Sequence, residues 1–265
     1  MIAKARRIAL LSAALLLSCQ PHHHSVTIAT TTSVEGSGLL QLMRVEFERQ
    51  TGIMLNAFVI GSGRALRLAS QGKVDLTITH DPEAERAFVA QNKPELYRQF
   101  MWNDFVIVGP RGDPAGISHA RSATEAFRRI YEARGKFLSR SDQSGTHMKE
   151  LSLWRAAGVS GKSNPNYIAI GQPMATLLRS ADELQAYALS DRATFDQLAP
   201  SLHVAILFSG DPTLRNVYAV TLMRRSDSEE HRNARTLANW ILSAGGRRLV
   251  ESFRIRGRQE FHWID

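Results

Sequence analysis

The chain has 265 residues, of which 43% are hydrophobic and 22% are charged, and both fractions are ordinary for a soluble globular protein. This length suits one large domain or two lobes of roughly 100 to 130 residues each. The formal net charge of +8 is spread along the chain, and the sequence has no basic patch interleaved with aromatic residues. The charge pattern therefore argues against a nucleic-acid partner.

The first 18 residues have the pattern of an export signal, with Lys4, Arg6 and Arg7 before the apolar run 8–17. That run is too short to span a membrane. The signal ends in Leu16-Leu17-Ser18-Cys19, which resembles the lipobox of bacterial lipoproteins, whose cysteine becomes the lipidated N-terminus. We therefore expect an extracytoplasmic protein anchored through Cys19, although an ordinary signal peptide with a chance cysteine is the alternative.

Cleavage after residue 18 would remove three of the 33 basic residues and none of the 25 acidic ones, which leaves a net charge of +5. This small excess slightly favours an anionic ligand or an anionic membrane surface. Residues 19–25 form the expected anchor and spacer. The run His22-His23-His24 is interpreted as spacer rather than metal site, because no Cys, Asp or Glu nearby completes a ligand set.

From residue 26 onward, short apolar runs alternate with stretches of helical periodicity. Leu39, Met43 and Phe47 recur at a spacing of four and predict the buried face of a helix. The predicted strands are 26–29, 53–60, 74–79, 105–108, 136–139, 186–189, 204–208 and 217–223. The predicted helices are 38–50, 64–70, one beginning at Pro82, 123–133, 149–157, 174–180 and 229–243. This alternation predicts an α/β fold with parallel sheets flanked by helices.

Polar loops follow several of the predicted strands, at the sheet edge where α/β proteins bind ligands. Thr31, Thr32 and Ser33 offer hydroxyl and amide donors before a helix, where an anion is favoured, although plain helix capping is the alternative. Gly61-Ser62-Gly63-Arg64 has the same position and is either a turn only or a ligand contact through Ser62 and Gly63; Arg64 remains undecided.

Arg140 is the strongest single candidate, because a guanidinium carries a fixed charge and forked donors that suit a tetrahedral oxyanion. Ser144-Gly145-Thr146 adds hydroxyl and amide donors at a helix start. A surface pair between Arg140 and Asp142 is the alternative interpretation. Arg192 has a similar position after a predicted strand and is a weaker candidate.

Several motifs, in one order from about residue 26 to 220, resemble the tungstate-binding proteins of bacterial ABC importers. They are Ala29-Thr30-Thr31-Thr32-Ser33, Gly61-Ser62-Gly63-Arg64-Ala65-Leu66, His80-Asp81-Pro82, the run 102–110, Ser139 to Thr146 with Lys149-Glu150, and Ser190-Asp191-Arg192. In that family, the threonine-rich loop and the Arg and Thr of the second loop contact the oxyanion. The resemblance therefore implies oxyanion contacts at Thr31, Thr32, Ser33, Arg140 and Thr146.

The resemblance also implies a two-lobed periplasmic binding protein of the type with two crossovers, a monomer that delivers tungstate, or its analogue molybdate, to a membrane permease. We expect one lobe to comprise residues 26–108 and 206–265 and the other 109–205. The expected cage adds Ser62, Gly63, Ser144, Gly145 and Arg192 to the family positions. No cofactor is expected.

The sequence departs from the family at three glycines. The family motif Arg-Gly-Asp is Arg140-Ser141-Asp142 here, and Asp-Arg-Gly-Thr, at 191–194, has Ala193 in place of glycine. Gly-Gln-Gly-Met, at 171–174, has Pro173 in place of its second glycine. The second loop also resembles phosphate-binding relatives, so phosphate is the second candidate ligand. Phosphate carries a proton at neutral pH and needs an acceptor, for which Asp81 and Asp142 are candidates; a helix cap is the alternative for each.

An enzyme is the main alternative class, since His80-Asp81 could act with Ser33 or Ser144. The sequence has no Gly-x-Ser-x-Gly elbow and no metal-ligand spacing, so we expect a binding protein without catalytic activity. A sensor that signals to a membrane partner remains a further alternative.

Overall fold

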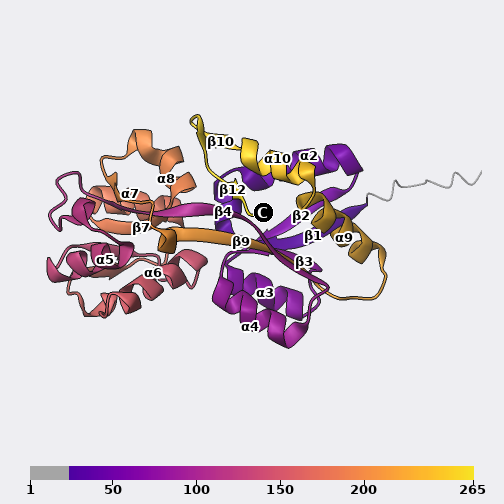
Figure 1. Ribbon diagram of the computed structural model, residues 1–265, viewed down its shortest axis with the longest axis horizontal. Coiled ribbons are helices and arrows are strands. Elements are labelled where there is room, and N and C mark those ends of the chain that lie inside the picture. Colours follow the sequence, from indigo (N-terminus) through magenta and orange to yellow (C-terminus); the bar gives the residue numbers. More distant parts are fainter. Residues whose placement is uncertain (1–23) are drawn as a thin grey trace, which may run out of the picture.

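The computed structural model describes residues 24–265, so the expected signal peptide, Cys19, His22 and His23 lie outside the described residues. Two lobes lie side by side in Figure 1, and each is a β-sheet covered by helices on both faces. The α/β class expected from the sequence is therefore confirmed.

The first lobe is built on a sheet with the order β2-β1-β3-β9-β4, and β12 pairs with the outer edge of β4. Its strands are β1 (Ser25–Thr30), β2 (Met54–Val59), β3 (Leu76–Thr79), β9 (Arg215–Leu222), the first part of β4 (Leu96–Gly109), and β12 (His262–Trp263). Strands β1, β2 and β3 are parallel, whereas β9 lies antiparallel between β3 and β4. A strand from late in the chain thus completes this sheet.

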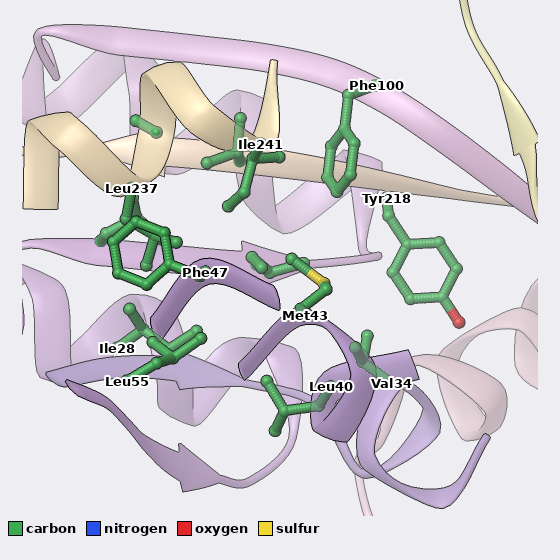
Figure 2. Close-up of a cluster of buried hydrophobic side chains, with 14 of the residues drawn as sticks. Ile28, Val34, Leu40, Met43, Phe47, Leu55, Phe100, Tyr218, Leu237 and Ile241 are labelled. Carbon is green, nitrogen blue, oxygen red and sulfur yellow. The ribbon is translucent and has the colours of Figure 1, made fainter. Parts of the chain in front are cut away.

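Helices cover both faces of the first sheet (Figure 1). One face carries α2 (Leu39–Thr51), α9 (Glu229–Ile241) and α10 (Ala244–Ser252), and the other carries α3 (Ser62–Ser70) and α4 (Pro82–Asn92); the short α1 (Thr32–Gly36) precedes α2. Figure 2 shows Ile28, Phe47 and Leu237 meeting in the core between the sheet, α2 and α9. The predicted face of Leu39, Met43 and Phe47 is buried, and burying one such large side chain contributes about 1.5–3 kcal/mol.

The second lobe has the sheet order β8-β4-β7-β5-β6, in which β4 contributes its last residues. Its other strands are β5 (Phe137–Ser139), β6 (Tyr167–Ala169), β7 (Tyr187–Asp191) and β8 (Ala205–Phe208). Helices α5 (Ala123–Glu132) and α6 (Gly145–Ala156) cover one face, and α7 (Met174–Leu184) and α8 (Arg192–Leu198) cover the other (Figure 1). Each face has its own apolar core.

The chain crosses between the lobes along β4 and again between β8 and β9. The part of β4 from Leu96 to Asp104 pairs with β9, whereas Phe105–Val108 pairs with β7 of the second lobe. The sequence predicted only 105–108, because residues 96–104 mix polar and apolar side chains and form no continuous apolar run. One strand therefore belongs to both sheets.

Other differences from the predicted elements are shifted helix ends and a few short elements that were not predicted. Helix α6 begins at Gly145, four residues before the predicted start, and the predicted helix 229–243 is followed by a separate helix, α10. Ser243 causes this break, because its hydroxyl accepts hydrogen bonds from the amides of Gly245 and Gly246 and so caps a new helix. The short elements α1, α8 and β6 were not predicted.

After α10, the chain forms a hairpin of β10 (Arg254–Ile255) and β11 (Arg258–Gln259) before it reaches β12. The hairpin belongs to the first lobe, yet β10 packs against α8 of the second lobe. Figure 1 shows it as a yellow loop between the two lobes.

Candidate functional site

The candidate site lies where the two sheets face each other with the carboxyl ends of their parallel strands. Three strands of the first lobe and two of the second end at this site. In the first lobe, β1, β2 and β3 end just before the threonine-rich run, Gly61 and His80. In the second lobe, β5 ends before Arg140, and β7 ends at Asp191. A helix begins within a few residues of each strand end, so amide donors and positive dipole ends gather at the same place.

The threonine-rich run is buried except for Thr32, and Thr31 does not cap a helix with its side chain. Thr31 is the N-cap residue of α1, yet its hydroxyl makes no capping hydrogen bond. The hydroxyls of Thr30 and Thr31 are buried and have no hydrogen-bond partner within residues 24–265. Thr32 is exposed, whereas Ser33 is buried. Capping, the alternative interpretation of this run, therefore does not account for Thr31.

His80 ties Ser33 and Ser62 together in the first lobe. Its Nε2 lies 3.3 Å from Oγ of Ser33, and its backbone amide donates to Oγ of Ser62 at 3.2 Å. Burial lowers the pKa of His80 to about 4, so the ring is neutral at pH 7. The ring packs against Tyr218, with 4.9 Å between the ring centroids. From the sequence, His80 was noted as part of a family motif and as a possible hydrolase residue, but its packing role was missed.

The second lobe contributes the loop of Arg140, whose side chain is only 5% exposed. Its Nη2 pairs with the carboxylate of Asp142, and its Nε has no partner among the described residues. Burial opposes ionisation of Asp142, but hydrogen bonds from Ser144 and the Arg140 charge outweigh it and hold the pKa below its usual value. The predicted pair between Arg140 and Asp142 exists, but Arg140 is buried beside the cleft rather than on the surface.

The rest of this loop leads into α6. Ser144 caps the helix, since its Oγ accepts from the amide of His147 at 3.4 Å. Thr146 is buried, and its hydroxyl has no partner within the described chain. Ser141 has a φ of 46°, in the left-handed region. The serine thus adopts the backbone path that glycine takes most easily.

Asp191 is an acidic residue of the site that sequence reasoning did not single out. It ends β7, is 1% exposed, and caps α8 by accepting from the amide and hydroxyl of Thr194 at 2.9 and 2.8 Å. Burial raises its pKa, while the Thr194 hydrogen bonds and the Arg140 charge oppose the rise. The signal that could have identified it is its place between a buried strand and a helix start.

Two of the cavities between the lobes share Thr32 and Arg140 in their walls. The smaller, of about 160 Å³, is also lined by Ser33, Asp191 and Thr194. The larger, of about 340 Å³, also contacts Gly63, Asp142 and Ser144 together with the 171–173 loop. Both lobes therefore contribute walls to each cavity, as expected for a ligand held between them.

Two candidates lie apart from these cavities. Arg192, the first residue of α8, lines neither of them, and its charge acts instead on Glu260 of the first lobe. Asp81 caps α4 by accepting from the amide of Ala84 at 3.1 Å. It lines a third interlobe cavity, with Lys149. Asp81 is therefore a capping residue in this structure.

The lobes are in contact around the cavities. Nε2 of Gln197 in α8 donates to the carbonyl of Ser37 at 3.0 Å. A Cβ added to Gly145 would lie 2.3 Å from Cε1 of His80, so the imidazole lies directly on the glycine backbone. Only glycine at position 145 lets the second lobe approach His80 this closely.

Within residues 24–265, no group of three His, Cys, Asp or Glu side chains is arranged to hold a metal ion. The same part of the chain contains no helix with the length and apolar character needed to cross a membrane.

The chain is similar in sequence and in structure to known binding proteins. A profile of the PBP superfamily domain matches residues 20–244. The tungstate-binding protein TupA of Peptoclostridium acidaminophilum is 36% identical over 234 residues, which cover 86% of this chain and 81% of that protein. The solved structure of TupA from Desulfovibrio alaskensis G20 matches with a TM-score of 0.80 and 32% identity, over 91% of this chain and 99% of that one. A structure described as the tungstate ABC transporter from Geobacter sulfurreducens matches with a TM-score of 0.77 and 34% identity. The match covers 86% of this chain and 98% of that one.

Proposed function

Because this chain belongs to the PBP superfamily and, within it, to the family of TupA tungstate-binding proteins, we propose that it captures tungstate between its lobes and delivers it to an ABC importer. Molybdate is the close analogue that the same cage would accept. The protein acts as a binding protein and not as an enzyme, and the bound oxyanion is its cargo rather than a cofactor.

The observation that carries this proposal is a set of buried polar side-chain atoms that find no partner among residues 24–265. They are the hydroxyls of Thr30, Thr31 and Thr146, Nε of Arg140, and Nδ1 of His80. Leaving a buried polar group without a partner costs about 1–3 kcal/mol, so several of them at the strand ends and helix starts that face the other lobe support a ligand that pairs with them. Hydroxyls and a guanidinium are donors that suit an oxyanion.

We assign the residues to the cage in two groups. Thr31, Arg140 and Thr146 bind the oxyanion through unpaired side-chain donors, and Ser33 is held beside them by His80. Thr32, Ser62, Gly63, Ser144 and Gly145 complete the cage through hydroxyls or backbone amides. Arg192 is left out of the cage because it is not among the buried donors without a partner, lines none of the three interlobe cavities, and directs its charge at Glu260 instead. Five or six charge-assisted hydrogen bonds at roughly 1.5–3 kcal/mol each, less the cost of association, would support binding near the nanomolar range.

The carboxylates of the site favour tungstate over phosphate. Asp142 is paired with Arg140 and accepts from the amide of Ser144, and Asp191 accepts from Thr194. Both acidic groups already serve protein donors, and no contact among the described residues sets either aside as an acceptor for a protonated ligand, whereas proton-free tungstate needs no acceptor at all. Tungstate carries no proton at neutral pH and is best bound by donors alone.

Thermal unfolding at neutral pH with added tungstate, molybdate, sulfate or phosphate tests the assignment. We expect tungstate to raise the unfolding temperature most, since a ligand that binds only the native state stabilises it in proportion to RT ln(1 + [L]/Kd). Sulfate serves as a matched divalent, proton-free control of smaller size. Stabilisation by phosphate without stabilisation by tungstate would contradict the proposal.

We further propose that the mature protein is an extracytoplasmic monomer, anchored to the membrane through Cys19, which presents the closed, loaded lobes to the importer's permease. The anchor rests on the sequence pattern, because position 19 precedes the described residues. A Cys19→Ser chain is expected to appear in the soluble fraction after cell disruption, while the unaltered chain remains with the membranes. Equal distribution of both chains would argue against the anchor.

A further inference from the structure

Glu260 is a buried acidic residue with no part in the oxyanion cage. It lies between the β10–β11 hairpin and β12 in the first lobe, and its side chain is 2% exposed. Neither carboxylate oxygen accepts a hydrogen bond from a donor group within residues 24–265, and the side chain that lies within hydrogen-bonding reach is another carboxylate, that of Asp196. A buried carboxylate without donors is costly, since charged groups are buried only when they are paired or neutralised.

The groups that face Glu260 come from both lobes. Asp196 and Arg192 belong to α8 of the second lobe, whereas Arg258, in β11, belongs to the first lobe, as Glu260 does. Nε of Arg258 lies 3.7 Å from Oδ2 of Asp196, which brings the hairpin and α8 together. The second lobe therefore contributes a carboxylate, partly compensated by Arg258, to the surroundings of a carboxyl group of the first lobe.

We propose that the pair of Glu260 and Asp196 is a proton-linked latch, in which Glu260 takes up one proton when the lobes close around the ligand. Two carboxylates repel each other when both are ionised, but one shared proton converts the pair into a donor and an acceptor. When α8 moves away with the second lobe, each carboxyl group is free to be hydrated and ionised. This inference rests on the proposed capture of tungstate by lobe closure.

Burial raises the pKa of Glu260 to about 8 in the closed structure, and the negative charge of Asp196 adds to the rise, whereas Arg192 and Arg258 oppose it. A group whose pKa is higher in the closed state favours that state at low pH. The advantage is complete below the ordinary glutamate pKa of about 4.3 and is lost as the pH rises through about 8. Ligand binding, which requires closure, is therefore expected to weaken over this range.

Calorimetric titration with tungstate between about pH 6.5 and pH 8.5 measures the effect, and this range avoids the polymerisation of tungstate in acid. We expect the affinity of the unaltered protein to fall roughly twentyfold across the range, with one proton taken up per tungstate bound near neutral pH. Proton uptake is read directly from titrations in buffers of different ionisation enthalpy.

Three variants separate the latch from other sources of pH dependence. Glu260→Gln keeps the shape and is always neutral, so it should bind with an affinity that changes less than about threefold over the range and take up no proton. Asp196→Asn removes the repelling partner and should reduce the pH dependence. Glu132→Gln alters an exposed carboxyl group at the end of α5 and should behave as the unaltered protein.

The outcomes distinguish this inference from the proposed function. If the unaltered protein binds tungstate at every pH but with constant affinity, or if Glu260→Gln keeps the full pH dependence, the latch is wrong while the function stands. If tungstate does not bind at any pH, the proposed function itself fails. Scattering profiles with tungstate present should show the closed form of Glu260→Gln at both ends of the pH range, which also shows that this variant is folded.

Discussion

Replacing Arg140 with alanine is expected to weaken tungstate binding by about a thousandfold or more, which corresponds to about 4 kcal/mol. Arg140 is 5% exposed and provides a fixed positive charge between the two cavities. Removing it deletes the donors that face the oxyanion and also leaves Asp142 and Asp191 without a compensating charge. Breaking a buried charge pair by removing one partner costs about 3–5 kcal/mol, and here the remaining carboxylates would also repel the anion.

Arg179→Ala is the matched control, because it removes an exposed arginine of α7 in the same lobe that lines none of the interlobe cavities. Titration calorimetry at about pH 7 should give this variant an affinity within about threefold of the unaltered protein. Circular dichroism of both variants checks that they are folded. Equal losses in the two variants, or nearly full affinity in Arg140→Ala, would contradict the assignment of Arg140 to the cage.

The second large effect is expected from Gly145→Ala, which adds one methyl group at the contact between the lobes. The new Cβ would lie 2.3 Å from Cε1 and 2.5 Å from Nδ1 of His80, closer than any real contact. His80 is buried and packed on Tyr218, so it has little room to move. We expect the variant to fold but to close poorly, with tungstate affinity reduced by about ten- to a hundredfold, because overpacking a buried contact costs about 1–3 kcal/mol.

A double-mutant cycle identifies the cause of this loss. If the clash with His80 blocks closure, then His80→Ala should restore much of the affinity in the Gly145→Ala background while weakening binding by itself. Gly112→Ala is the matched control, since a Cβ there would meet no atom within 4 Å. Strictly additive effects of the two substitutions would show that Gly145 acts through its backbone amide alone.

The placement of the site could be predicted from the sequence, because it follows from local patterns. Apolar runs such as Leu76–Thr79 mark buried strands, and the polar residues that follow them fall at the carboxyl edge of a parallel sheet. The threonine-rich run and Arg140 were found in this way. The resemblance to a family then supplied the ligand, which no local pattern could have named.

The contacts between lobes could not be predicted, because they depend on residues that are distant in sequence and carry no local signal. His80 lies on Gly145, and Glu260 lies near Asp196, only because both lobes are folded and in contact. Arg192, rather than its neighbour Asp191, was chosen from the sequence as a candidate ligand residue. The sequence does not show which way the side chain of a charged residue at a helix start points. The first part of β4 was missed because residues 96–104 mix polar and apolar side chains with neither a strict alternation nor a continuous apolar run.

The order of strands in the first lobe also governs when that lobe can fold. Residues 215–222 insert between Leu76–Thr79 and Leu96–Asp104, so the sheet is incomplete until almost the whole chain has been synthesised. Before then, two strand edges that end up buried have no partner, and such edges are templates for aggregation. The closing step also spans the entire second lobe, and pairing across so long a segment slows folding. The second lobe, whose strands are mostly contiguous in sequence, can therefore form first and bring the ends of the first lobe together.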